Sequence, residues 1–388
     1  MSKAIDRVLT DPVEAGKLPG VVGMVANDSG IIYQGAFGRR AIDRSDPMTL
    51  DTVFRIASMT KAVTATAAMQ LIEAGRIGLE QPVGEILPFA RDVQVLEGFD
   101  DAGKPRLRAP ARAVTVRHLL THTSGYGYDI FNADLGRYVQ TLGLPSILTC
   151  RLDSLTVPLL FDPGTRWEYG IGIDLVGRIV ETVSGQDLEA YFQQHIFGPL
   201  HMSDSSFRPT EAMRARMVAT HARGPDGNIA PISFEFPQDA EFLMGGGGLY
   251  STAADYLAFC RMLLAGGALD GRRVLKPETL KLMGQNHIGE IDVPILRSNN
   301  PQMALEFEFF PGIVKKWGLS FLLNLSDVPG GRTAGSLTWA GVHNTFFWVD
   351  PASRITAVLM MQLLPANDPA VLETLLGFET ALYRVCRG

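Results

Sequence analysis

The sequence is poor in cysteine and has no long apolar run. Its three cysteines, Cys150, Cys260 and Cys386, are widely spaced, and no Cys-x-x-Cys pair occurs. This spacing excludes a disulfide framework and a cysteine-ligated zinc site, and we expect no metal centre. No apolar stretch reaches the ~18 residues that a membrane-spanning helix needs. The sequence therefore predicts a protein that does not enter membranes.

The N-terminus lacks the pattern of a secretory signal. The first twenty residues, MSKAIDRVLTDPVEAGKLPG, mix polar and apolar side chains and include Asp6, Asp11 and Glu14. A signal peptide needs a continuous apolar core, which this segment does not have. We therefore expect a cytoplasmic location.

An excess of positive charge is also missing. The chain has 35 lysines and arginines against 41 aspartates and glutamates, which gives a net charge of −6 and a pI near 5.7. Proteins that bind nucleic acid use basic patches to displace counterions from the phosphates. No such patch occurs in this sequence, and we expect no nucleic-acid partner.

The order of the elements predicts an α+β fold with two lobes. Two β-rich runs flank a turn at residues 27–30, a helix is expected over residues 60–74, and β-rich runs return near the C-terminus before a last helix over about residues 369–385. We predict that these two ends form one antiparallel sheet flanked by helices.

The middle of the chain has a different pattern. Between residues 88 and 237, short helical pieces alternate with loops rich in glycine, proline and aspartate. We therefore predict two domains: residues 1–87 and 238–388 form the sheet domain, and residues 88–237 form a mostly helical, loop-rich domain. The active site is expected in the cleft between them.

One lysine stands in an otherwise small and apolar helical stretch, RIASMTKAVTATAAMQLIEAG. Ser58 and Lys61 are three residues apart, so on a helix both side chains lie on one face. Apolar neighbours favour a neutral lysine, and a neutral lysine can deprotonate a serine hydroxyl. With 18 serines and eight lysines, chance predicts about 0.4 such Ser-x-x-Lys pairs in this chain. The spacing alone therefore also fits a solvated surface lysine.

Two further stretches follow in order. Tyr169 lies in WEYGIG, a glycine-rich segment before an expected helix, and WAG, residues 339–341, lies on an expected C-terminal strand. With Ser-x-x-Lys they resemble the three motifs of serine β-lactamases and penicillin-binding proteins. The chain most resembles the family VIII carboxylesterases, which are related to class C β-lactamases. HLLTHTSG and GGGGLYSTAADY also resemble stretches of this esterase branch.

The resemblance implies an acyl-enzyme cycle without a cofactor. Ser58 would attack the ester carbonyl, while Lys61 and Tyr169 would share the proton as general base and then as general acid. Water would hydrolyse the acyl-enzyme with the same base. The residues implied at the oxyanion hole or the substrate are Ser58 and Val342 through their backbone N–H groups, together with Trp339 and Gly341.

Two departures from the β-lactamase pattern favour neutral substrates. Trp339 stands where β-lactamases carry a lysine that holds the substrate carboxylate, and Ile171 stands where they carry an asparagine. We therefore predict a serine carboxylesterase acting on a small-molecule ester, with a short acyl chain and weak β-lactamase activity at most. The alternatives on the same fold are a β-lactamase, a D-aminopeptidase, an acyltransferase and, less favoured, a non-catalytic binding protein.

Other motifs are interpreted as structural. Ser124 in HTSG lacks the Gly-x-Ser-x-Gly pattern of a nucleophile elbow. His118 and His122 have the i, i+4 spacing of zinc ligands but not the glutamate of His-Glu-x-x-His. The glycines at 245–248 predict close backbone approach beside the cleft. The sequence leaves open whether His343 faces the pocket.

Overall fold

The computed structural model describes residues 2–387. A seven-stranded sheet with the strand order β11-β12-β13-β14-β15-β1-β2 is the centre of one lobe, and every neighbouring pair in it is antiparallel. The strands are β1 (Gly20–Asn27), β2 (Gly30–Gly38), β11 (Lys315–Trp317), β12 (Leu322–Asn324), β13 (Leu337–Gly341), β14 (Thr345–Asp350) and β15 (Ile355–Met360). β1 pairs with β15, so the two ends of the chain share one sheet, as predicted.

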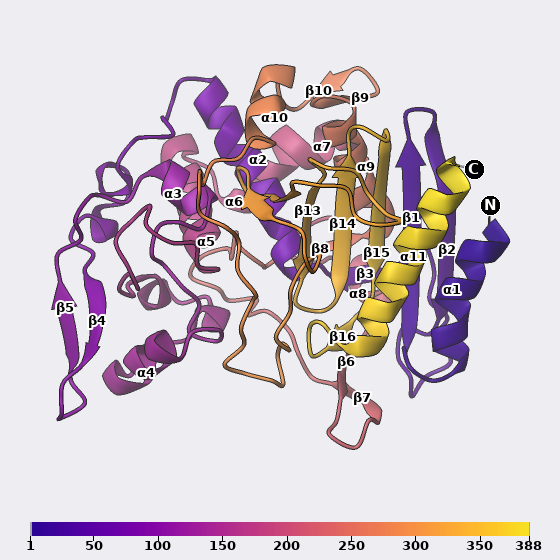
Figure 1. Cartoon of the computed structure of the whole chain (residues 1–388), viewed down its shortest axis with the longest axis horizontal. Helices are drawn as coiled ribbons and strands as arrows, with labels where there is room; N and C mark the ends of the chain where they lie inside the picture. Colours follow the sequence, from indigo (N-terminus) through magenta and orange to yellow (C-terminus); the bar gives the residue numbers. More distant parts are fainter. Residues whose placement is uncertain (1, 388) are drawn as a thin grey trace.

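The helices lie on both faces of this sheet and in the second lobe (Figure 1). They are α1 (Ser2–Glu14), α2 (Thr60–Glu73), α3 (Val116–Leu120), α4 (Ala133–Leu142), α5 (Gly172–Ser184), α6 (Leu188–Phe192), α7 (Gly198–Leu200), α8 (Glu211–Ala215), α9 (Ala253–Leu264), α10 (Pro277–Met283) and α11 (Pro369–Arg387). None of the helices within residues 2–387 is both long enough and apolar enough to cross a bilayer.

Each face of the sheet has its own apolar core, which explains why β1 is apolar at nearly every position. Val21 and Val25 belong to the cluster under α1 and α11, whereas Val22 and Met24 belong to the larger cluster that includes α9 and α2. Successive side chains of a strand point to opposite faces, so a sheet covered on both sides buries both sets. The predicted antiparallel sheet flanked by helices is confirmed.

The remaining strands form small sheets. β3 (Val53–Arg55) pairs with β8 (Tyr250–Thr252), β4 (Val95–Phe99) with β5 (Pro105–Arg108), and β9 (Ala268–Leu269) with β10 (Arg272–Arg273), whereas β6 (Thr220–Arg223) pairs with both β7 (Ile229–Ile232) and β16 (Leu363–Leu364). Figure 1 shows β4, β5 and α4 at the end of the molecule opposite the two termini. The parallel pairing of β6 with β16 ties the end of the middle segment to the C-terminal part of the chain.

Two local features differ from the sequence expectation. α1 was not among the predicted elements; it contains Pro12, and its apolar Ile5 and Leu9 become buried only against the sheet and α11. Residues 335–351, whose sequence predicts one β-rich run, form a hairpin of β13 and β14. The run breaks at Asn344, which adopts φ 66°, a left-handed conformation that asparagine tolerates better than most residues.

Candidate active site

Ser58 lies in η1 (Ala57–Met59), a 3₁₀ turn that leads directly into α2. α2 carries almost no polar face because the helix is buried on all sides from Thr60 to Met69. Its position inside the protein, rather than on a surface, explains the run of small and apolar residues after Ser58. Ala57, just before the serine, has φ 44°, a strained value for a residue with a Cβ.

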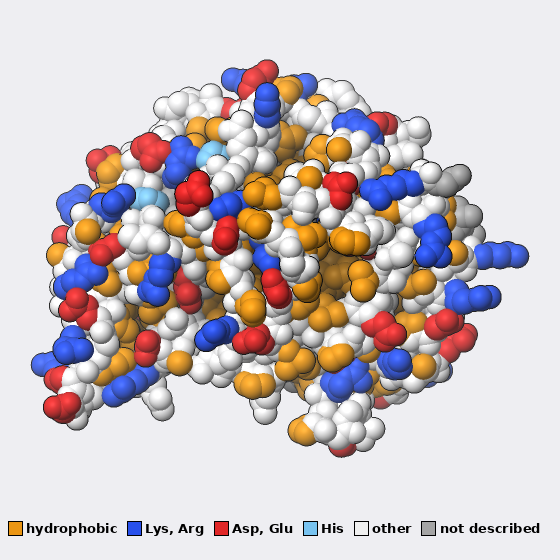
Figure 2. All heavy atoms as spheres, viewed as in Figure 1, with side chains coloured by type: hydrophobic (Ala, Val, Ile, Leu, Met, Phe, Trp, Pro, Cys, Tyr) orange, Lys and Arg blue, Asp and Glu red, His pale blue; other side chains and the backbone are white. Residues whose placement is uncertain are grey.

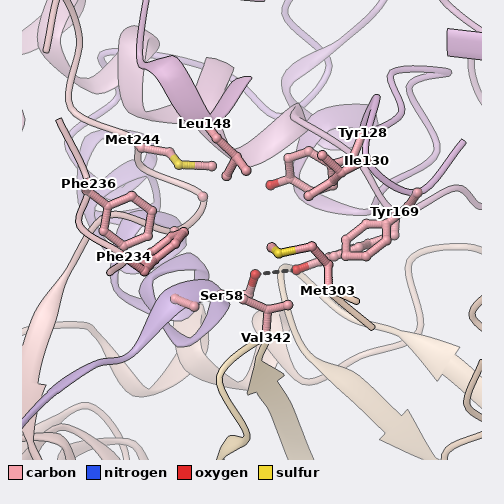
Figure 3. A pocket seen from close by; sticks show the side chains of 14 residues that line it. Ser58, Tyr128, Ile130, Leu148, Tyr169, Phe234, Phe236, Met244, Met303 and Val342 are labelled. Atoms are coloured by element: carbon pink, nitrogen blue, oxygen red, sulfur yellow. Dashed lines mark hydrogen bonds between the residues drawn. The ribbon is translucent and has the colours of Figure 1, made fainter. Parts of the chain in front are cut away.

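The structure brings together the three residues that the motifs single out. Lys61 Nζ donates to Ser58 Oγ at 3.0 Å. The Tyr169 hydroxyl donates to the same oxygen at 2.5 Å, which the dashed line in Figure 3 marks. Lys61 is only 1% exposed, so its amino group is shielded from solvent as expected. Both candidate bases therefore contact the oxygen that would act as nucleophile.

Lys61 has two further partners. Its Nζ donates to the Tyr128 hydroxyl at 3.0 Å and to the backbone oxygen of Gly246 at 2.6 Å. With Ser58 Oγ this makes three acceptors, which matches the three N–H donors of a lysine ammonium. Tyr128 in turn donates to Asp174 Oδ2 at 3.2 Å.

Burial controls the charges of this network. It raises the pKa of Asp174, while the Lys61 charge and hydrogen bonds from Gly246 and Tyr128 oppose that rise. Burial also raises the pKa of Tyr128 well above its usual value, and the neighbouring Asp174 carboxylate adds to the effect. Tyr128 therefore stays a neutral phenol near pH 7, with its proton toward Asp174 and its oxygen lone pairs toward Lys61.

Trp339 has a contact that its sequence motif does not reveal. Its indole N–H donates to the Tyr169 hydroxyl oxygen at 3.2 Å, and its ring packs against Trp317 and Phe309. The side chain is 3% exposed and is not among the residues lining the pocket around Ser58. An N–H aimed at the Tyr169 oxygen stabilises negative charge that develops there. Direct contact of Trp339 with substrate stays a prediction.

Gly341 and Val342 lie at the end of β13, next to the turn that holds Ser58. A Cβ on Gly341 would lie 2.3 Å from Thr345 Oγ1 and 2.4 Å from the backbone oxygen of Ile56, so only glycine lets the strand approach this closely. Thr345 Oγ1 also donates to Ile56 O at 3.1 Å. Val342 and Ser58 line the same pocket (Figure 3), which places both predicted oxyanion-hole residues beside one another.

The pocket above Ser58 is apolar and small, with a volume of about 40 Å³. Figure 3 shows Phe234, Phe236 and Met244 facing Tyr128 and Tyr169 across it. The other residues that line it are Ala57, Ser58, Ile130, Phe131, Leu148, Gly246, Gly247, Met303 and Val342. No lining residue in the described part of the chain has a formally charged side chain.

On the outer face drawn in Figure 2, lysine and arginine are interspersed with aspartate and glutamate. The expectation that nucleic acid is not a partner stays a prediction.

The histidines and Ser124 have structural positions. His122 is buried against the rings of Trp167, Tyr169 and Trp317, and burial with the nearby positive charge lowers its pKa well below the usual value. Ser124 Oγ accepts from the backbone N–H of Tyr126 at 3.3 Å.

His118 helps to cap the start of α3 through its Nδ1, which accepts from the backbone N–H of Thr115 at 3.2 Å. His343 does not line the pocket; it packs on Phe234, and burial lowers its pKa to about 3. No group of three or more His, Cys, Asp or Glu within residues 2–387 is placed to hold a metal ion.

Comparisons with known proteins identify the family of this chain. Residues 5–382 match the family model described as Beta-lactamase. The chain belongs to the Beta-lactamase family.

Two curated relatives of this family member cover nearly all of its length. The monacolin J acid methylbutanoyltransferase of Aspergillus terreus is 34% identical over 396 residues, covering 96% of this chain and 93% of that protein. The lovastatin esterase of Penicillium rubens is 31% identical over 397 residues, covering 98% of each chain. A solved simvastatin synthase variant from Aspergillus terreus matches with a TM-score of 0.87 and 32% identity, covering 99% of this chain and 96% of that one. The predicted relationship to β-lactamases is confirmed.

Two residues of this Beta-lactamase family site were missed by sequence reasoning. Tyr128 follows the HTSG loop in GYGYD, and Asp174 stands in the first turn of α5. Asp174 gave a usable signal, because a single carboxylate between Ile173 and Leu175 interrupts an apolar helix face. Tyr128 gave none, since its contact with Lys61 spans 67 positions of sequence.

The close approach at Gly341 generates a test. We expect Gly341→Ala to lower kcat by about two orders of magnitude if the predicted ester cleavage is the reaction, because the added Cβ displaces the Val342 N–H from its predicted oxyanion position. Gly78→Ala is the control, since its Cβ would meet only Gln81 Cβ, at 3.9 Å. Steady-state kinetics measure both variants, after thermal unfolding shows that they are folded. A Gly341→Ala enzyme with the kcat of the parent would contradict this role.

Proposed function

We propose that this protein is a serine esterase that cleaves neutral carboxylic esters with short acyl chains through an acyl-enzyme on Ser58. The observation that carries the proposal is that Ser58 Oγ contacts both Lys61 Nζ and the Tyr169 hydroxyl at the edge of an uncharged pocket. A nucleophile within hydrogen-bond reach of its base is the signature of covalent catalysis.

The reaction begins when Ser58 Oγ attacks the ester carbonyl carbon. In the reactive form, the Lys61 and Tyr169 pair has one proton fewer than in the arrangement where both groups donate to Ser58 Oγ. As the new C–O bond forms, the Ser58 proton passes to this pair, and the carbonyl oxygen takes the negative charge. Backbone N–H groups of Ser58 and Val342 stabilise that oxyanion. Trp339 stabilises negative charge on the Tyr169 oxygen.

The tetrahedral intermediate then collapses. The ester C–O bond breaks, the leaving alcohol takes back the proton from the same pair, and the acyl group stays on Ser58. In the second half of the cycle, a water molecule gives its proton to the pair and attacks the acyl carbon. The bond between the acyl carbon and Ser58 Oγ then breaks, Ser58 takes the proton back from the pair, and the carboxylic acid leaves.

The pocket supports the choice of substrate. Its apolar lining favours a hydrocarbon chain, and its small volume favours a short one. Because no lining residue among those described is charged, a substrate carboxylate would be buried there without a partner, at a high free-energy cost. These features support the proposal that the substrates are neutral esters rather than β-lactams, as the resemblance to the family VIII carboxylesterases implies.

A direct test is hydrolysis of p-nitrophenyl butyrate. We expect Ser58→Ala to reduce turnover by at least about a thousandfold, because the nucleophile is lost. Ser124→Ala is the matched control: it removes a buried hydroxyl from the neighbouring HTSG loop and should keep most of the activity. Residual activity of Ser58→Ala close to that of the parent, or loss of activity in Ser124→Ala alone, would refute the assignment.

Transfer of the acyl group to an alcohol is the second candidate. It is favoured by the likeness to the methylbutanoyltransferase over 96% of this chain, and by a pocket with few polar groups to hold a water molecule. In this version an alcohol, rather than water, attacks the same acyl-enzyme and gives its proton to the same base.

The two candidate functions differ in how the acyl group is divided between water and an alcohol. With p-nitrophenyl butyrate and increasing 1-propanol, a transferase forms propyl butyrate at the expense of butyric acid, because propanol competes for the acyl-enzyme. Gas chromatography measures both products, and Ser58→Ala gives the background. Butyric acid alone at every propanol concentration would exclude transfer to small alcohols.

A further inference from the structure

We propose that Asp174 is a positioning residue that fixes the catalytic Lys61 through two separate arms, the Tyr128 hydroxyl and the Gly246 backbone. This inference rests on the proposed function, because it gives Asp174 a role in the same reaction. Asp174 touches neither the pocket nor Ser58, and it acts through the two groups that hold the lysine.

The two arms are built alike. Asp174 Oδ1 accepts from the Gly246 N–H at 2.7 Å, and Oδ2 accepts from the Tyr128 hydroxyl at 3.2 Å. Each donor then presents an oxygen to Lys61 Nζ, at 2.6 Å from Gly246 and at 3.0 Å from Tyr128. Besides Ser58 Oγ, Lys61 has two acceptors, and the Asp174 carboxylate fixes both of them.

The backbone beside Asp174 is shaped to fit this carboxylate. A Cβ on Gly246 would lie 2.5 Å from Asp174 Oδ2, so any other residue here would displace the carboxylate or the backbone. This contact gives a physical reason for glycine in the middle of GGGG. On the neighbouring turn, Ile171 offers no hydrogen-bonding side chain, so Tyr128 and the nucleophile Ser58 are the side chains that accept from Lys61.

Packing alone does not explain an acidic residue at this position. Asp174 is 0% exposed, and burying a carboxylate is costly unless a cation and hydrogen bonds compensate. Lys61 is the cation whose charge acts on it. The result is a buried Lys–Asp pair bridged by the Tyr128 hydroxyl and by the backbone N–H and C=O of Gly246, and the lysine also contacts the nucleophile.

The negative charge also has a predicted effect on the pH dependence. The titratable groups that interact with Asp174, or with Tyr128 beside it, are Lys61 on α2, Tyr128 and Asp129 in the loop before α4, Cys150 after η4 (Ile147–Thr149) and Tyr169 in the loop before α5. His122 packs on Tyr169, and the charge of Lys61 acts on it. Among these groups, Lys61 is the cation that the negative charge of Asp174 attracts. Removing that charge takes away the attraction between the Asp174 carboxylate and the Lys61 ammonium.

Asp174→Asn tests this role because the amide keeps the shape and removes the charge. With p-nitrophenyl butyrate, we expect kcat to fall by about tenfold or more, while KM stays within about twofold, since Asp174 does not line the pocket. We also expect the acidic limb of the kcat/KM profile to move to lower pH by about one unit. A purely structural residue would lower stability without moving this limb.

Asp255→Asn is the matched control. Asp255 is also a buried carboxylate, but it accepts from Ser205 and from the backbone N–H of Asp204, which do not line the pocket. Its removal should lower the thermal stability while leaving the pH limb and kcat of the folded enzyme unchanged. Tyr128→Phe removes one arm, and we expect it to shift the limb in the same direction as Asp174→Asn. Combined with Asp174→Asn, it should add less than its separate effect.

The outcomes separate this inference from the proposed function. Activity that survives in Ser58→Ala overturns the proposed function itself. Loss of activity in Ser58→Ala, together with an Asp174→Asn enzyme whose kcat and pH limb match those of Asp255→Asn, overturns only the role of Asp174. If Asp174→Asn does not fold, Tyr128→Phe carries the test, and an unshifted limb in that variant overturns the role.

Discussion

The buried amino group of Lys61 is the constraint on which the site depends. A lysine that is 1% exposed needs a partner for each of its donors, because an unpaired buried charge is costly. The three acceptors, Ser58 Oγ, Tyr128 Oη and Gly246 O, come from segments far apart in the sequence. Satisfying one side chain therefore brings together α2, the loop before α4 and the glycine segment before β8.

The surroundings of this group suit both the fold and the chemistry. The Ser58 turn touches β13 closely enough to require glycine at Gly341, so the sheet supports the nucleophile directly. Aromatic rings from Trp317, Trp339 and Tyr169 pack together on one side of the site. In such a dry, apolar setting each hydrogen bond to a developing charge is stronger than it would be in water.

The sequence predicted the features that depend on residues close together in the chain or on motifs in a known order. Ser58 and Lys61 were found because their contact depends only on helix geometry, and Tyr169 was found because its motif occurs in a known order. The contact of Tyr128 with Lys61 and that of Trp339 with Tyr169 depend on packing between distant segments, which no spacing reveals. The sheet was predicted from its apolar runs. The helix α1 was not, because its apolar residues are buried only by packing on the sheet and α11.

The central claim is that Ser58 carries the acyl group. The most direct measurement is peptide mapping by mass spectrometry of protein quenched in acid during turnover of p-nitrophenyl butyrate. The account predicts a butyryl group on the peptide that contains Ser58, at that serine. A butyryl group on another residue instead, such as Ser124, with Ser58 unmodified throughout turnover, would contradict it.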